Sequence, residues 1–383
     1  MTRSLSRARR GAALGALALA VLALSAAPAP VMSVPQEAPA GAPSPEAAAY
    51  LEAALAILQA NFLHRDAIDW TALRQETLRQ AGHAQTSVDT YPALRYALAK
   101  LGDHHSYLQL TPALTATETA RKPELVDPSA MPVPLVRPPT FPFPSPFRTR
   151  RVPEGALVVG SPAPVAQVVV PLFSSGDRVE IDAFATTLQT ILKTLLAAHP
   201  CGWVVDLRGN GGGNIWPMKA GLGPLLGSGH FKAAIDHAGV TTDWFYDNGA
   251  AGGRSGATDE TYAQARAPVL IPGTPPIAVL IDRDTGSSGE GLAIAFHGRP
   301  NTRFFGETTF GAATSTFPYA LSDGAQIYLV TAVMVDRDGH EYPAGVRPDE
   351  EILSEATIST ADPVLQAAAK WASAQPGCRR GGD

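Results

Sequence analysis

Two polar turns carry residue types that suit nucleophilic catalysis, and each comes at or shortly after the end of a short apolar run. Residues 206–214 read DLRGNGGGN, and residues 285–290 read TGSSGE. Successive glycines allow a backbone to present N–H groups to a ligand at close range. A serine at the start of a helix has free N–H groups and a positive field beside it, which favours a nucleophilic hydroxyl and a developing oxyanion. The alternatives are a tight turn for the first segment and ordinary N-capping for the second.

A nucleophilic serine needs a base, and two adjacent histidines, His104 and His105, follow the end of a predicted helix in a polar turn. Metal binding is the weaker interpretation of this pair, because neighbouring residues rarely point at one ion and no acid at helical spacing completes a ligand set. The glycine turn lacks the Lys-Ser/Thr ending of a phosphate loop, and its glycine spacing does not fit a dinucleotide site. Hydrolytic chemistry therefore fits these residues better than phosphate or metal chemistry.

The elements that must position these turns alternate between strands and helices. Strands are predicted at residues 167–172, 203–207 and 276–281, and helices at 179–198 and 288–297. This alternation argues for an α/β domain with a largely parallel sheet, in which ligands lie beyond the carboxyl ends of the strands. Upstream, three amphipathic stretches predict a small helical region, and the third, residues 89–101, leads directly into the histidines.

The composition excludes several classes of protein. The 383 residues include 35 acidic and 30 basic ones, for a formal charge of −5. A nucleic-acid-binding protein would need clustered surplus lysine and arginine, so we expect no nucleic-acid partner. Apolar residues at 45% and charged residues at 17% predict a folded core, whereas 35 glycines and 34 prolines predict long loops around it.

The first 27 residues are predicted to be an export signal. Four arginines precede an uninterrupted apolar run, Gly11 to Leu24, and small residues then offer a cleavage zone. A permanent membrane anchor is the alternative, but Pro28 and Pro30 end the apolar run. We therefore expect a periplasmic or secreted protein that is soluble and has no lasting membrane insertion after cleavage.

Four further segments follow from the composition and the patterns. They are a Pro/Ala linker at 28–43, the helical region with the histidines at 44–121, a Pro-rich arm at 122–154 and the α/β core at 155–375. The two cysteines, Cys201 and Cys378, either form a disulfide after export or remain unpaired thiols, and the sequence favours neither outcome.

Five short motifs, which follow one another along the chain in a particular order, extend these observations. They are LGDHHS at 101–106, VDLRGNGGG at 205–213, TGSSGE at 285–290, FGETTFG at 305–311 and GVRPD at 345–349. Over residues 46–355 this order closely resembles the C-terminal processing (tail-specific) protease and tricorn-core serine peptidase family. The resemblance implies a crotonase-like α/β core with a small N-terminal helical region, serine peptidase chemistry, and no metal or organic cofactor.

The resemblance also implies roles for individual residues. Ser287, three residues before the acid of its motif, is the predicted nucleophile, and His105, followed by a serine, is the predicted general base. The backbone N–H groups of Gly212 and Ser288 are the predicted oxyanion donors, each typically worth about 3 kcal/mol of barrier.

The chain departs from the family pattern around the base. Ala312 stands where the processing-protease branch has its lysine base, so a Ser/Lys dyad at that position is excluded and the histidine base of the tricorn branch fits instead. His104 occupies the place of a serine that helps to orient the histidine in that branch. The acid that completes this orientation is predicted to be Glu341, with Asp338 and Glu307 as rivals.

The chain also lacks the peptide-binding PDZ domain of the processing proteases, and the Pro-rich arm stands in its place. Residues 238–267 are predicted to form a loop or hairpin, and packing is favoured over substrate contact for its aromatic residues, Trp244, Phe245 and Tyr246.

These observations predict an exported serine peptidase that acts on peptide or protein substrates. The alternative is a non-catalytic ligand- or peptide-binding member of the same family. A crotonase-type acyl-CoA enzyme is disfavoured by the export signal and by the lack of a basic cluster for the CoA phosphates.

Overall fold

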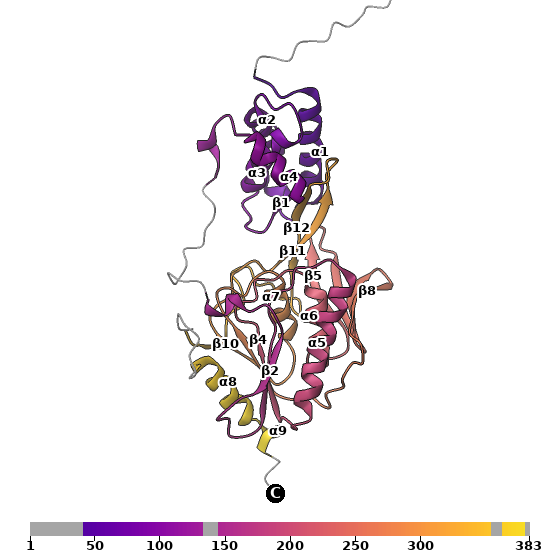
Figure 1. Ribbon diagram of the computed structural model, residues 1–383, viewed down its shortest axis with the longest axis vertical. Coiled ribbons are helices and arrows are strands. Elements are labelled where there is room, and N and C mark those ends of the chain that lie inside the picture. Colours follow the sequence, from indigo (N-terminus) through magenta and orange to yellow (C-terminus); the bar gives the residue numbers. More distant parts are fainter. Residues whose placement is uncertain (1–40, 133–144, 354–361, 380–383) are drawn as a thin grey trace, which may run out of the picture. The chain divides into compact units, whose positions relative to one another are not determined.

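A computed structural model of the protein describes residues 41–132, 145–353 and 362–379, all within one unit of the chain, residues 40–383 (Figure 1). The predicted signal and nearly all of the predicted Pro/Ala linker lie outside the described residues, as does the middle of the Pro-rich arm, residues 133–144. Over the described ranges, the structure has no helix that combines the length and the apolar character needed to cross a bilayer.

A six-stranded sheet carries both polar turns. Its order is β13–β10–β9–β4–β3–β2, and every neighbouring pair is parallel except β2 with β3. The strands are β2 (Glu154–Leu157), β3 (Val165–Val169), β4 (Gly202–Asp206), β9 (Ile277–Ile281), β10 (Thr302–Gly306) and β13 (Glu350–Glu351). β4 and β9 are central and completely buried, as expected of apolar strands covered on both faces. The glycine turn follows β4 and the serine turn follows β9, so the two turns lie at the same edge of the sheet.

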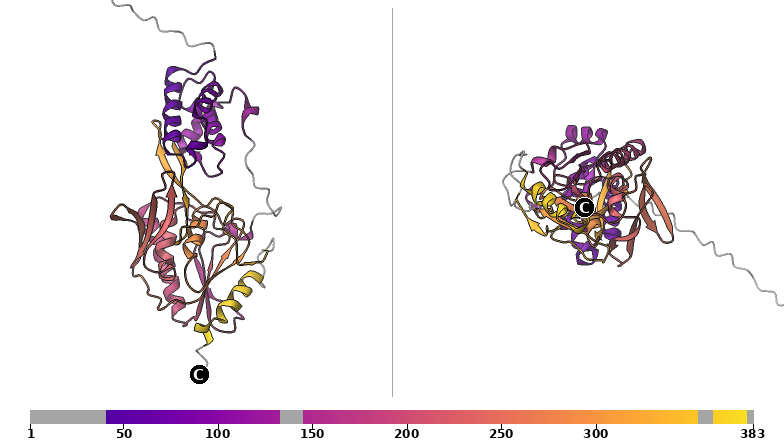
Figure 2. Two further views of the ribbon diagram at one scale, coloured as in Figure 1. Left: turned by 180° about the vertical axis from the view of Figure 1, so that it is seen from behind. Right: turned by 90° about the horizontal axis from the view of Figure 1, so that it is seen from below.

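Helices cover both faces of this sheet (Figures 1 and 2). They are α5 (Arg178–Leu196), α6 (Ile215–Leu226), α7 (Ser288–Phe296) and α8 (Pro363–Ser373). Because side chains alternate along a strand, Val205 of β4 packs with Leu188 of α5 and Leu222 of α6 in one core. Its neighbour Val204 packs with Ala368 of α8 in a separate core.

A second sheet is antiparallel throughout and has the order β1–β12–β5–β6–β7–β8, with β11 paired to β12. Its strands are β1 (Tyr107–Gln109), β5 (Gly229–Asp236), β6 (Thr241–Asp247), β7 (Ala250–Ser255), β8 (Thr258–Gln264), β11 (Thr314–Ala320) and β12 (Gln326–Met334). Residues 238–267 thus form three strands where the sequence predicted a loop or hairpin. The side chains of Trp244, Phe245 and Tyr246 are buried, so their packing role is confirmed.

The helical region packs on the hairpin formed by β11 and β12. Its helices are α1 (Pro45–Asn61), η1 (Arg65–Ala67), α2 (Trp70–Ala81), η2 (Val88–Thr90), α3 (Tyr91–Lys100) and α4 (Pro112–Arg121). Ile327 and Leu329 of β12 share one hydrophobic core with these helices. At the tip of the hairpin, the Asp323 carboxylate accepts hydrogen bonds from the hydroxyls of Tyr50 (2.9 Å) and Tyr91 (2.7 Å).

The end of the arm and a disulfide complete the core. The arm continues with η3 (Pro128–Ala130) and ends with η4 (Pro146–Thr149), which lies against the core. Cys201, just before β4, forms a disulfide with Cys378 of α9 (Pro376–Arg379), with 4.8 Å between their Cα atoms. Of the two outcomes that the sequence left open, the structure has the disulfide.

Candidate active site

Ser287 occupies a sharp strand-to-helix turn between β9 and α7. It is the N-cap residue of α7, with φ 51° and ψ −119°. A non-glycine residue in such a region of backbone conformation costs about 1–3 kcal/mol, which the surrounding contacts must offset. The side chain is partly exposed, whereas its neighbours Gly286 and Ser288 are buried. The turn therefore leaves one serine partly accessible at the start of a helix, the position of nucleophilic serines on α/β folds.

Glu290 fixes this turn to a second loop. Its buried carboxylate accepts the N–H of Ser287 (3.1 Å), the hydroxyl of Thr309 (2.6 Å) and the N–H groups of Gly311 and Ala312 (2.7 Å each). Burial raises the pKa of Glu290, and these four donors act in the opposite direction. The sequence pattern S-x-x-E is typical of a capping box, and this was the one signal that could have revealed the role of Glu290.

The glycine turn packs directly on the serine turn. A Cβ atom on Gly212, whose φ is +105°, would lie 2.8 Å from the Cβ of Ser287 and 2.9 Å from the nitrogen of Ser288. The N–H of Gly286 donates to the carbonyl of Asn210 at 3.0 Å. Only a residue without a side chain fits at Gly212, so the two predicted turns meet backbone to backbone.

The two predicted oxyanion donors differ in whether their N–H groups already have a hydrogen-bond acceptor. The N–H of Ser288, in the first turn of α7, has no acceptor within the part of the chain that the structure describes. The N–H of Gly212 donates to Oδ1 of Asn210 at 3.0 Å. Gly212 therefore lies beside the serine, but its service as a donor to substrate requires that the Asn210 side chain release it.

His105 is held in a turn built by Asp103. Oδ1 of Asp103 accepts the N–H groups of His105 (2.7 Å) and Ser106 (2.6 Å). The imidazole Nδ1 lies 2.8 Å from the hydroxyl oxygen of Thr314. Burial lowers the pKa of His105, and the charge of Asp103 opposes this shift. A lowered pKa keeps the ring neutral near pH 7, the state that a proton acceptor needs.

A short path of contacts links His105 to the serine turn. Thr314, which contacts the ring, begins β11 two residues after Ala312, and the N–H of Ala312 donates to Glu290. The same carboxylate accepts the N–H of Ser287. In this way Glu290 and the segment from Ala312 to Thr314 connect Ser287 to the residue that contacts the His105 ring.

The acids predicted to orient His105 have other partners. Glu341 is exposed and forms a β-bridge with Val335, and Glu307 is ion-paired with Arg283 at 2.7 Å. Among residues 41–132, 145–353 and 362–379, no carboxylate forms a hydrogen bond with the His105 ring. The side chain that contacts the His105 ring is instead that of Thr314. This threonine follows a short run of small residues, and nothing in that sequence marks it as functional.

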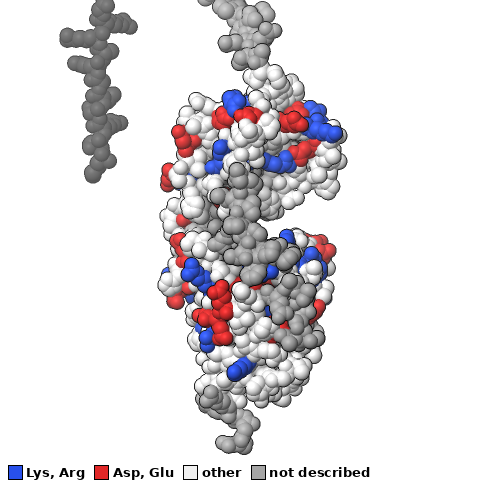
Figure 3. All heavy atoms as spheres, turned by 90° about the vertical axis from the view of Figure 1, so that its left-hand side faces the viewer, with Lys and Arg blue, Asp and Glu red and all other residues white. Residues whose placement is uncertain are grey.

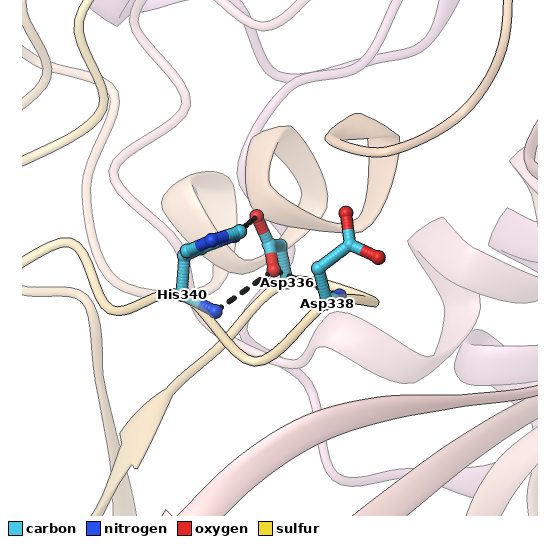
Figure 4. A group of neighbouring side chains, drawn as sticks. All are labelled: Asp336, Asp338 and His340. Atoms are coloured by element: carbon cyan, nitrogen blue, oxygen red, sulfur yellow. Dashed lines mark hydrogen bonds and ion pairs between the residues drawn. The ribbon is translucent and has the colours of Figure 1, made fainter.

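Asp338, the remaining rival, belongs to a tight turn with Asp336 and His340 (Figure 4). Oδ1 of Asp336 accepts the backbone N–H groups of residues 338–340 at 2.9 Å each. Its Oδ2 accepts the hydroxyl of Tyr342 at 2.7 Å and lies 3.1 Å from Nδ1 of His340. The Asp336 carboxylate therefore caps this turn, which explains why the three side chains lie together. Both of its oxygens are used by donors within the turn.

Charged side chains on the face drawn in Figure 3 are interspersed, with basic and acidic groups adjacent to one another. This distribution matches the small net charge of the chain, and it differs from the concentrated positive surface that binds a phosphate backbone.

Comparison with known proteins places these features in context. Residues 165–352 match the model of peptidase family S41. The nisin-resistance protein of Lactococcus lactis subsp. lactis is 27% identical over 302 residues, which are 78% of this chain and 80% of that protein. The carboxy-terminal processing protease CtpA of Bacillus subtilis (strain 168) is 25% identical over 176 residues, 45% of this chain and 34% of that protease, so only about a third of its length is matched.

Two solved structures share the fold. A lipoprotein from Streptococcus agalactiae is 21% identical, with a TM-score of 0.61 over 86% of this chain and 96% of that one. The photosystem II D1 C-terminal processing protease is 18% identical, with a TM-score of 0.53 over 87% of this chain and 98% of that one. The predicted α/β fold with a small N-terminal helical region is confirmed.

Proposed function

Since residues 165–352 are a domain of peptidase family S41, we propose that the protein is an exported serine peptidase, with Ser287 as nucleophile and His105 as general base. The family supports a hydrolase that acts on peptide or protein substrates. The observation that carries the assignment to this site is the position of Ser287. It is a partly exposed serine at a positive-φ turn, beside an N–H of Ser288 that has no acceptor within the described ranges.

The proposed reaction proceeds by acyl transfer. His105 accepts the proton of the Ser287 hydroxyl while the oxygen attacks the scissile carbonyl carbon. The carbonyl oxygen becomes an oxyanion, stabilised by the N–H of Ser288 and, once Asn210 releases it, by that of Gly212. His105 then gives its proton to the leaving amine as the C–N bond breaks. Water, deprotonated by His105, attacks the acyl-enzyme, and the proton returns to Ser287 as the acid product leaves.

Thr314 takes the orienting role in this proposal. In the tautomer that leaves Nε2 as the acceptor, Nδ1–H donates to the Thr314 oxygen, which is 2.8 Å away. A neutral hydroxyl stabilises an imidazolium less than a carboxylate does, so the lowered pKa of His105 accords with this partner.

Export to the periplasm or the medium is part of the proposal. The disulfide between Cys201 and Cys378 supports it, because such bonds persist in oxidising compartments. The predicted signal at residues 1–27 is the second support.

A second candidate function is peptide binding without turnover. It is favoured by the hydrogen bond from Gly212 to Asn210, which occupies one of the two predicted oxyanion donors. One relative is named for resistance to nisin, so nisin belongs among the test ligands of this protein for either function.

The proposal is tested by labelling the mature protein with a fluorophosphonate and locating the adduct by mass spectrometry. An adduct on Ser287 is expected in the wild-type protein and absent from Ser287→Ala and His105→Ala. His104→Ala is the matched control, because that side chain is exposed and adjacent to the base, and it should label at the wild-type rate. A folded wild-type protein that stays unlabelled would favour the binding function.

A further inference from the structure

The final residues of the Pro-rich arm are built into the core beside the catalytic turns. Ser145 and Phe147 are 3% and 4% exposed, as buried as residues of the central sheet. The N–H of Ser145 donates to Asp284 at 2.6 Å, and the N–H of Phe147 bonds back to the Ser145 hydroxyl at 3.2 Å. Loop segments usually run over the surface, so such burial requires specific partners.

One partner is the Asp282 carboxylate, which follows β9 and has no exposed surface. Its Oδ2 accepts the hydroxyl of Ser145. Its Oδ1 accepts the N–H of Gly209 at 2.9 Å and the hydroxyl of Thr285 at 3.1 Å. Gly209 begins the glycine turn and Thr285 begins the serine turn, so one carboxylate joins the arm to the roots of both turns.

The aromatic ring of Phe147 supplies a second attachment. Two guanidinium groups lie over it, with 3.9 Å from its centroid to the Arg208 Cζ and 4.4 Å to the Arg150 Cζ. Both arginines bond to Oδ2 of Asp206 at 2.8 Å, at the end of β4. These contacts combine cation–π attraction with buried ion pairs, which hold the ring in one place.

The glycine turn is shaped to receive the arm. Gly209 has a φ of +73°, and a Cβ atom there would overlap the carbonyl of Phe147 and the backbone nitrogen of Arg148. The backbone of the arm thus occupies the space that a side chain at position 209 would fill. A larger residue there would push the two segments apart.

We propose that residues 145–150 act as a latch that aligns the glycine turn with the serine turn, and that Ser145 is a positioning residue that works through Asp282. The proposal rests on the function proposed above for Ser287. The latch touches neither Ser287 nor Gly212, and its contacts lie at the opposite ends of their turns. Without it, the donor N–H groups and the nucleophile lose a shared anchor and no longer keep a common geometry.

The first test compares Ser145→Ala with Ser129→Ala, a change of an exposed serine earlier in the same arm. The rate constant for fluorophosphonate labelling of Ser287 should fall about 10-fold or more in Ser145→Ala, since a 1 Å misplacement in an active site costs about 100-fold. With a peptide substrate, kcat should fall by a similar factor while KM changes little. Labelling of folded Ser145→Ala at the wild-type rate would overturn the proposal.

A double-mutant cycle tests the route through Asp282. If Ser145 acts on the turns through this carboxylate, adding Ser145→Ala to Asp282→Asn should lower the labelling rate no further. Losses that multiply across the two positions would show that Ser145 acts by another route.

Hydrogen exchange provides a readout that needs no catalysis. Amides at 209–214 and 285–288 should exchange faster in Ser145→Ala, while those of the helices at 45–121 stay unchanged. Unchanged exchange in the two turns would refute the latch. If the wild-type protein takes no fluorophosphonate, the peptidase function fails, and the exchange result still decides for or against the latch.

Discussion

At the scale of single residues, the sequence pointed to Ser287, Ser288, Gly212 and His105, and the structure gathers the first three at one pair of turns. Glycine-rich and serine-containing turns at strand ends are recognisable because their residue types match a backbone requirement. Thr314 had no such mark, since a threonine at the start of a strand is ordinary and its contact with His105 spans 209 positions of sequence.

Replacement of Thr314 tests the orientation of the base. Thr314→Val keeps the shape and removes the hydroxyl that lies beside Nδ1 of His105, so the ring should lose its preferred tautomer and orientation. We expect kcat to fall about 10-fold, less than the roughly 100-fold or more that loss of a general base itself costs, with KM nearly unchanged. Thr314→Ser keeps the hydroxyl and should retain most of the activity. Equal activity of the valine and wild-type proteins would remove Thr314 from the mechanism.

The pH dependence of labelling follows from the burial of His105. Its pKa is lowered, and the neutral ring is the proposed base, so the labelling rate should rise with pH through a midpoint below the ordinary value of about 6.5 and then stay level. A group whose folded pKa is lowered binds fewer protons in the folded state, so His105 should also reduce stability as the pH falls below about 6.5. The measurement is the rate from pH 4.5 to 8, and a midpoint above 7 would contradict it.

At the scale of elements, the central strands and the turns after them could be predicted, because buried β-strands are continuous apolar runs. The antiparallel sheet could not. Its strand β6 was hidden in a segment rich in glycine, threonine and aspartate, and β1 pairs with β12 across more than 200 residues. Local periodicity carries no information about such pairings. The hairpin of β11 and β12 is the element that joins the helical region to the site.

The hydrogen bonds at the tip of this hairpin should stabilise that junction. Asp323→Ala leaves the hydroxyls of Tyr50 and Tyr91 without their acceptor, and we expect a loss of about 1–3 kcal/mol in the free energy of unfolding. The labelling rate should fall as well, since Thr314 lies at the base of the same hairpin. Thermal or urea unfolding measures the first effect. Asp66→Ala, at a fully exposed side chain, is the control, and an equally small effect of both changes would contradict the prediction.

At the scale of the whole molecule, composition correctly indicated a folded protein, and the alternation of predicted strands and helices indicated its α/β class. Neither could decide the state of Cys201 and Cys378, because 177 positions separate them and a sequence gives no distance between them. The fold brings the two cysteines together. Cys201 lies just before the central strand β4, and α8, which precedes α9, packs on that strand.

Removing the disulfide should destabilise the protein. Restraint of a loop of this length in the unfolded chain predicts a loss of about 2–5 kcal/mol for Cys201→Ser with Cys378→Ser. The melting temperature should fall in the double variant, and the wild-type protein should match it after reduction. Reductant should have no further effect on the variant itself. A wild-type melting temperature that is insensitive to reduction would contradict this account.

The hairpin of β11 and β12 also determines when the proposed active centre can form. A chain made from its N-terminus contains His105 and Ser287 well before it contains Thr314, and β12 is complete only at Met334. Until those last residues are available, the helical region lacks the strand on which it packs, and the base lacks its partner. A nascent chain therefore carries Ser287 and His105 without the assembled site, and under the proposed function peptidase activity arises only once the chain through Met334 has been made and folded.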